Sequence, residues 1–145
     1  MTTNTKDACE TCPIHDAAAL KKLGVDMSDF DYVVALAGNP NTGKSTVFNA
    51  LTGLRQHTGN WPGKTVSRAE GGFEYGDHKY KMVDLPGTYS IDGFSSEEKI
   101  VKDFLQNKSY DVILNVIDST NLTRNMLLTL ELLNLILLVS CIIIH

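Results

Sequence analysis

The sequence lacks the features that mark several protein classes. Its three cysteines among 145 residues are too few and too scattered for a disulfide framework, so we expect a reducing compartment. It does not begin with a basic segment followed by an apolar one, and no signal peptide is predicted. It has no basic run and a net charge of −4, which argues against a nucleic-acid partner. With 43% hydrophobic and 21% charged residues, it fits one globular domain or part of one.

Residues 1–29 form a polar N-terminal extension that we expect to lie outside the core. Within it, residues 16–24 have the pattern of a short helix with a capping Asp and a terminal Gly. Cys9, Cys12 and His15 have the spacing of metal ligands, but they supply at most three. Two interpretations stay open: a reduced, mobile tail, which we favour, and a metal or redox site.

The most informative stretch is Gly38-Asn39-Pro40-Asn41-Thr42-Gly43-Lys44-Ser45, which fits the phosphate-loop pattern G-x-x-x-x-G-K-[ST]. The apolar run at 32–37 predicts a buried strand before it, and residues 45–52 predict a helix after it that ends at Gly53. Backbone N–H groups of such a loop, together with the positive end of the helix, bind phosphate. The motif predicts that Lys44 reaches the β- and γ-phosphates and that the Ser45 hydroxyl binds Mg²⁺.

The rest of the chain predicts an α/β fold with a mixed sheet. Weak alternation at 65–75 predicts an edge strand, which the turn at Gly76-Asp77 joins to a strand at 78–83. A hairpin beside a parallel core implies a mixed sheet. The other predicted elements are loops at 54–64 and 85–95, a helix with Ser95 as N-cap that runs to about Asn107, a strand at 111–118 and a helix at 122–133.

Two further segments complete a predicted phosphate site. Thr65 lies on the loop after the first helix, where it can close on Mg²⁺ and the γ-phosphate. Asp84-Leu85-Pro86-Gly87 follows a strand, so that Asp84 can hold Mg²⁺ through a water and the Gly87 N–H can meet the γ-phosphate. Because both contacts depend on the γ-phosphate, the pattern predicts a nucleotide switch. A P-loop ATPase or kinase is an alternative, but we recognise no substrate-binding or lid segment for it.

The apolar tail at 134–145 allows two interpretations. Residues 135–144 have no charge, no Gly and no Pro, which suits a strand buried on both faces. From Met126 to Ile144 only Glu131 is charged, which is long enough for a marginal membrane span. We favour a helix that covers the sheet for the first part of this segment, because its polar residues have helical spacing.

Four stretches carry a more specific signature, namely residues 38–53, 59–66, 83–90 and 115–125. They resemble the N-terminal GTPase domain of the ferrous-iron transport protein B (FeoB) family, and the similarity covers about Tyr32 to Leu133. The resemblance implies a Ras-like P-loop GTPase fold, GTP as the nucleotide, and Mg²⁺ bound by Ser45 and Thr65. It implies a switch domain on the cytoplasmic face of the bacterial inner membrane, attached to a membrane transport domain for ferrous iron.

The resemblance also implies a K⁺ site. Asn41 matches the residue whose side chain binds K⁺ in potassium-activated members, where carbonyls at the positions of Gly59 and Trp61 help to hold the ion. Thr88 stands where Ras-type enzymes carry a water-positioning Gln, and the glycine loop has no Arg. A K⁺ that bridges the phosphates would supply the missing positive charge in the transition state. Alternatively, Asn41 stabilises a turn and Trp61 is simply packed or exposed.

The expected site is therefore composed of three overlapping sets of residues. Asn41, Lys44 and Thr65 are the candidate catalytic residues. Ser45, Thr65 and Asp84 are the candidate Mg²⁺ ligands, whereas Asn41, Gly59 and Trp61 are those for K⁺. The candidate nucleotide contacts are Gly38, Asn39, Pro40, Asn41, Thr42, Gly43, Lys44, Ser45, Thr46, Gly63, Lys64, Thr65, Val66, Ser67, Asp84, Leu85, Pro86 and Gly87.

The sequence departs from the family at residues 134–145. The Asn/Thr-Lys-x-Asp loop that normally reads guanine is missing, and an apolar tail stands in its place. We interpret residues 30–133 as a partial G domain and the tail as a truncation, a frameshift or a divergent end. The fold is then incomplete on its C-terminal side, where at most one strand built from the tail could cover the edge of the strand at 111–118. An uncovered edge would favour homo-oligomers or aggregation of an otherwise soluble fragment. A non-catalytic fragment or interaction module with weak, unselective nucleotide binding is the alternative function.

Overall fold

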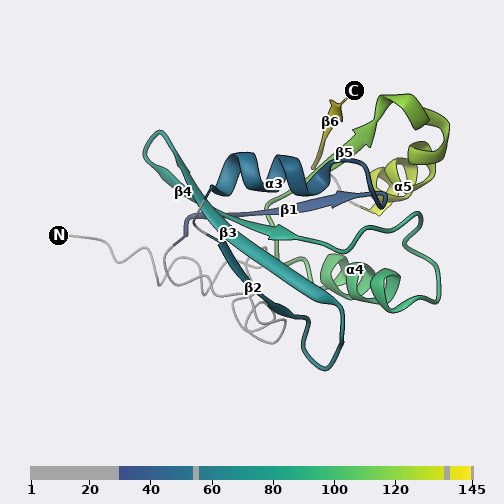
Figure 1. The fold of residues 1–145 in the computed structure, drawn as a ribbon, viewed down its shortest axis with the longest axis horizontal. Helices are drawn as coiled ribbons and strands as arrows, with labels where there is room; N and C mark the ends of the chain where they lie inside the picture. Colours follow the sequence, from purple (N-terminus) through teal and green to yellow (C-terminus); the bar gives the residue numbers. More distant parts are fainter. Residues whose placement is uncertain (1–29, 54–55, 136–137, 145) are drawn as a thin grey trace.

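A computed structural model describes residues 30–53, 56–135 and 138–144. They form a six-stranded sheet with the strand order β2-β3-β4-β1-β5-β6 (Figure 1). The strands are β1 (Tyr32–Gly38), β2 (Gln56–Asn60), β3 (Ser67–Tyr75), β4 (His78–Asp84), β5 (Val112–Asp118) and β6 (Val139–Ile144). The helices in these ranges are α3 (Lys44–Thr52), α4 (Ser96–Gln106) and α5 (Leu122–Leu135), with the 3-10 turn η1 (Ser119–Asn121) before α5.

The sheet is mixed, as the sequence predicts. β1 lies between β4 and β5 and pairs with both in parallel, whereas β2, β3 and β4 pair antiparallel. The β3–β4 hairpin turns at Gly76-Asp77, where Tyr75 pairs with His78. The predicted loop at 54–64 was wrong for residues 56–60, which form β2, and the strand predicted at 65–75 was wrongly placed at the edge of the sheet. β2 pairs with β3 and forms that edge of the sheet, which makes β3 internal.

Alternating residues of β1 form two hydrophobic cores, one on each face of the sheet. Val33, Ala35 and Ala37 pack with buried side chains of α4 and α5. Val34 and Leu36 pack with Phe48 of α3 on the opposite face. β1 is therefore buried on both sides, as a central parallel strand requires. This arrangement holds the C-terminal end of β1, where the phosphate loop begins, between α3 and α5 (Figure 1).

α4 begins as its sequence predicts. The Ser95 hydroxyl accepts the Glu98 N–H at 3.1 Å, and the Glu98 carboxylate accepts the Ser95 N–H at 3.0 Å. This capping box satisfies two backbone donors at the helix start. Its inward face places Ile100, Val101 and Phe104 in the core.

The apolar tail contains a strand rather than a membrane-spanning helix. α5 ends at Leu135, and β6 pairs in parallel with β5 from Val139 to Ile144. The expectation that this strand is buried on both faces was wrong, because Ser140, Cys141 and Ile143 are exposed. Within the described ranges, no helix is long and apolar enough to cross a membrane. The predicted helix at 16–24 and the Cys9, Cys12 and His15 cluster lie outside the described residues.

Candidate phosphate-binding site

The loop between β1 and α3 has the tight backbone that its sequence requires. Asn41 and Gly43 both adopt left-handed conformations, with φ of 63° and 85°. Glycine tolerates this region without strain, and asparagine is among the few other residues that visit it regularly. The Thr42 hydroxyl donates to the Asn39 carbonyl at 3.0 Å, and the Thr46 N–H donates to the Gly43 carbonyl at 3.0 Å. The loop is thereby wound directly into the first turn of α3.

A pocket of about 470 Å³ opens over this loop. Its lining consists of the consecutive loop residues together with one residue of the segment after β4, namely Asn39, Pro40, Asn41, Thr42, Gly43, Lys44, Ser45 and Gly87. Gly87 lies so close to the loop that a Cβ atom on it would stand 2.9 Å from the Pro40 Cα. The two predicted phosphate-contacting segments therefore share one pocket.

Lys44 joins the loop to the end of β4. Its ammonium forms an ion pair with the Asp84 carboxylate and donates to the Leu85 carbonyl at 2.7 Å. Both side chains of the pair are largely buried, with 11% and 18% of their surface exposed. Burial raises the pKa of Asp84 above its ordinary value, and the charge and hydrogen bond of Lys44 oppose this rise. A phosphate group entering the pocket would compete with Asp84 and Leu85 for the lysine.

Two buried polar residues fix the loop from the side of α5. Asn39 donates from Nδ2 to the Arg124 carbonyl at 3.1 Å. Its Oδ1 has no hydrogen-bond partner among the described residues, although Asn39 is only 3% exposed. Thr88, which stands where Ras-type enzymes carry Gln, is also buried, and its N–H donates to the Gly38 carbonyl at 3.2 Å. The Asn39 side chain and the Thr88 backbone thus hold the loop in place, and Asn39 also lines the pocket.

The predicted contact residues between Gly59 and Ser67, which we call the first switch, lie apart from this pocket. Among the described residues, the pocket lining does not include Gly59, Trp61 or Thr65. Gly63, Lys64, Thr65 and Ser67 are exposed, and Val66 is half-buried against the core. The Trp61 carbonyl accepts the Lys64 N–H at 2.9 Å, which closes a turn. The Trp61 side chain is buried against Phe104 of α4, with ring centroids 6.0 Å apart, so the packing alternative describes it.

The residues present suit Mg²⁺ better than they suit K⁺. Mg²⁺ prefers hard oxygen ligands and commonly combines one or two carboxylates with substrate phosphates. Ser45 and Lys44 line the pocket, and the Asp84 carboxylate is paired with the Lys44 ammonium. In the described part of the chain there is no cluster of three His, Cys, Asp or Glu residues for a pre-formed metal site. Of the candidate K⁺ ligands, Asn41 alone lines the pocket in this conformation.

Comparison with known proteins decides the family. A family model described as ferrous iron transport protein B matches residues 32–144, which is most of the chain. The chain belongs to the FeoB family. The match runs past Leu133 and through β6.

Individual FeoB proteins support this assignment. The chain is 52% identical over 104 residues to the Fe(2+) transporter FeoB of Methanocaldococcus jannaschii, and 50% identical over 106 residues to that of Escherichia coli O157:H7. These alignments cover 72% and 70% of this chain but 16% and 14% of the relatives. The chain thus spans about a sixth of the length of these transporters.

Solved FeoB structures share the fold. The G domain of T. maritima FeoB superposes with a TM-score of 0.76 at 44% identity, covering 77% of this chain and 70% of that domain. The cytosolic domain of L. pneumophila FeoB gives 0.71 at 44% identity, covering 75% and 44%. A variant of S. thermophilus NFeoB bound to GDP gives 0.73 at 43% identity, covering 78% and 44%. The expected Ras-like P-loop GTPase fold is confirmed.

Proposed function

We propose that this chain is the GTP-binding and GTP-hydrolysing switch domain of a ferrous iron transporter. The observation that carries this proposal is the pocket in which the phosphate loop, Lys44 and Gly87 come together. The exposed backbone of the loop and the Lys44 ammonium provide donors for phosphate, and Ser45 and Asp84 provide oxygen ligands for Mg²⁺. We take guanine as the base of the nucleotide because a FeoB relative of known structure is bound to GDP.

In this proposal Thr65 joins the site only with a triphosphate. It is exposed and outside the pocket lining, so the first switch must move to bring its hydroxyl to Mg²⁺. Such movement is typical of switch loops that γ-phosphate and Mg²⁺ order together. Asn41, which already lines the pocket, then holds K⁺ with the carbonyls of Gly59 and Trp61. The Trp61 carbonyl must first release the Lys64 N–H.

The proposed setting follows from the relatives. The domain acts at the cytoplasmic face of the cell membrane, attached to the transport domain that carries ferrous iron. Nucleotide state at the pocket then controls transport through movement of the first switch and of the segment after β4 that contains Gly87. The comparisons name FeoB proteins as Fe(2+) transporters, and this link to iron is inherited from them.

A titration with a fluorescent GTP analogue tests the proposal. We expect saturable, Mg²⁺-dependent binding that Lys44→Ala weakens by about ten- to a hundredfold, because a hydrogen bond to a charged group contributes about 1.5–3 kcal/mol. Lys99→Ala, which removes an exposed lysine of α4, is the matched control and should bind normally. Equal binding by the two variants would contradict the role of the pocket.

A non-catalytic module with weak, unselective nucleotide binding is the second candidate. Two observations favour it: the sequence has no Asn/Thr-Lys-x-Asp loop, and Thr65 lies outside the pocket. Phosphate release separates the two functions. GTP turnover above the rate of Lys44→Ala supports the switch, whereas binding without turnover supports the module.

A further inference from the structure

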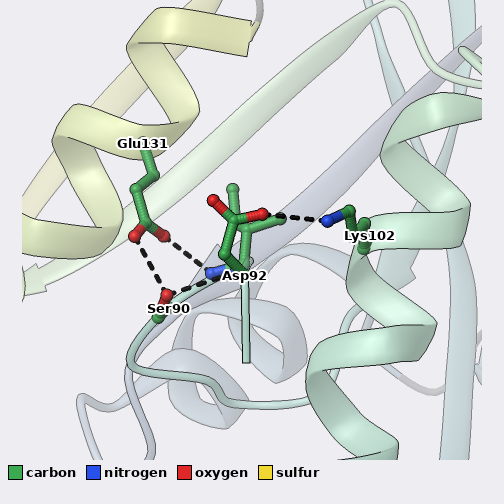
Figure 2. A network of polar contacts seen from close by, with 5 residues as sticks. Ser90, Asp92, Lys102 and Glu131 are labelled. Atoms are coloured by element: carbon green, nitrogen blue, oxygen red, sulfur yellow. Dashed lines mark hydrogen bonds and ion pairs between the residues drawn. The ribbon is translucent and has the colours of Figure 1, made fainter. Parts of the chain in front are cut away.

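The segment after Gly87 is tied to α5 by a carboxylate that the nucleotide site does not use. Glu131 of α5 accepts the Ser90 hydroxyl at 2.9 Å through Oε1 and the Ile91 N–H at 2.6 Å through Oε2 (Figure 2). Each carboxylate oxygen thus holds a different donor of the same short segment. Glu131 is the only charged residue in the sequence from Met126 to Ile144.

Neighbouring contacts make this segment a connector between the pocket and two helices. The Ser90 hydroxyl also accepts the Asp92 N–H at 3.2 Å, and Lys102 of α4 pairs with Asp92 at 2.9 Å (Figure 2). The Ile91 side chain is 1% exposed and packs in the core with residues of α4 and α5. The segment is consequently fixed by polar contacts on its surface side and by burial on the other.

The upstream end of the same segment forms the wall of the pocket. Gly87 packs against Pro40 of the phosphate loop, and the next N–H, of Thr88, donates to the Gly38 carbonyl at 3.2 Å. Arg124 of α5 lies over the Tyr89 ring at 4.4 Å. Every residue from 87 to 91 therefore has a defined contact with the phosphate loop, with β1 or with α5. Only Thr88 and Tyr89 separate Gly87 from Ser90, so the position of Ser90 restricts that of Gly87.

We propose that Glu131 is a positioning residue that holds Gly87 in place to receive the γ-phosphate. The inference rests on the proposed nucleotide function. A backbone N–H binds a ligand most tightly when it is already ordered, because binding then carries no ordering penalty. In the proposed site the Gly87 N–H meets the γ-phosphate, which GDP lacks, so we expect the Glu131 contact to raise affinity for triphosphate over diphosphate. A carboxylate is the suitable group, since it accepts two hydrogen bonds and carries charge that strengthens both.

Amide hydrogen exchange of the nucleotide-free protein tests the contact without relying on nucleotide binding. We expect Glu131→Leu to accelerate exchange at Ile91 by about tenfold or more, because the charged acceptor is lost. Leu130→Gln, at a 54% exposed position of the same helix, is the control and should leave Ile91 unchanged. Unchanged exchange at Ile91 in Glu131→Leu would overturn the inference. If that variant does not fold, Ser90→Ala and Glu131→Gln are measured instead, and each should give a smaller acceleration.

Nucleotide affinity then distinguishes a positioning role of Glu131 from a role in protein stability alone. Glu131→Leu should weaken a non-hydrolysable GTP analogue by about tenfold, and GDP by less than about twofold. A merely structural role would weaken both nucleotides alike, and that result would overturn the proposal. If wild-type protein binds neither nucleotide while Ile91 exchange responds to Glu131→Leu, the proposed function fails and the contact of Glu131 with Ser90 and Ile91 remains as a purely structural one.

Discussion

Lys44 occupies the central position at the scale of single residues. Its ammonium contacts Asp84 and the Leu85 carbonyl, so it connects the phosphate loop to the end of β4. A phosphate group that binds the Lys44 ammonium must replace at least part of these contacts, which would leave the Asp84 carboxylate without its cation. Mg²⁺ fits that need, because a carboxylate released from lysine becomes a free oxygen ligand. The proposed nucleotide and Mg²⁺ sites therefore share one ion pair, that of Lys44 and Asp84.

Asn41 gives the first prediction at this scale. If its side chain holds K⁺ beside the phosphates, GTP turnover should be faster in K⁺ than in Na⁺, because the ion stabilises negative charge in the transition state. Asn41→Ala should remove this difference and leave GDP affinity within about threefold, since the diphosphate contacts come from the loop backbone and Lys44. Steady-state phosphate release at equal ionic strength measures the effect. Equal rates of GTP turnover by the wild type in K⁺ and in Na⁺ would contradict the proposed role of K⁺.

Tyr110 gives a prediction about pH. Burial raises the pKa of its phenol, and the hydroxyl donates to the Leu105 carbonyl at 3.3 Å. The neutral form is favoured in the folded state, so this contribution to stability is complete below the unfolded pKa of about 10 and is lost as pH rises through the folded pKa.

Urea denaturation at about pH 9 and pH 11 checks this sign around the ordinary tyrosine pKa. The free energy of unfolding should fall more with pH in the wild type than in Tyr110→Phe. Tyr75→Phe, at a 77% exposed position, should behave as the wild type does. The same pH dependence in all three proteins would contradict the prediction.

At the scale of secondary-structure elements, α4 depends on its first turn. The Ser95–Glu98 capping box starts a helix whose buried face supports both Trp61 and the core under β1. Ser95→Ala should lower the free energy of unfolding by about 1 kcal/mol, the usual loss for an N-cap hydroxyl. Ser96→Ala, one residue on and exposed, is the control and should change stability by less than about 0.5 kcal/mol. Equal urea midpoints for Ser95→Ala and Ser96→Ala would contradict the capping role of Ser95.

Elements with a strong local pattern could be predicted, and those that depend on a partner strand could not. The strand, loop and helix around Gly38–Ser45 and the capped start of α4 are encoded in neighbouring residues. β2 has the sequence Gln-His-Thr-Gly-Asn, which contains no apolar residue, and it becomes a strand by pairing with β3. The Glu131–Ser90 bond joins residues 41 positions apart, and no sequence pattern indicates such a contact.

β6 shows how the whole molecule completes the site. It covers the edge of β5 and brings Ile144 against the phosphate loop, where the Ile144 Cδ1 stands 2.6 Å from the position of a Cβ on Gly43. Glycine at this position is thus required by both its backbone angle and its neighbour. β6 is in turn the outer strand of the described sheet and carries no charged residue, which favours pairing with another chain.

The central claim is that these residues form a working phosphate site, and thermal unfolding with nucleotide tests it most directly. With Mg²⁺ and GTP at about a hundredfold over the dissociation constant, stability should rise by about 2.7 kcal/mol, or roughly 8 °C in Tm. ATP at the same concentration distinguishes the two candidate functions: a smaller rise than with GTP supports the GTP switch, and an equal rise supports the unselective module that the missing Asn/Thr-Lys-x-Asp loop favours. Lys44→Ala, with its expected ten- to hundredfold weaker binding, should show only about 0.4–1.4 kcal/mol of this rise at the same GTP concentration. A wild-type Tm that neither nucleotide changes would contradict the account.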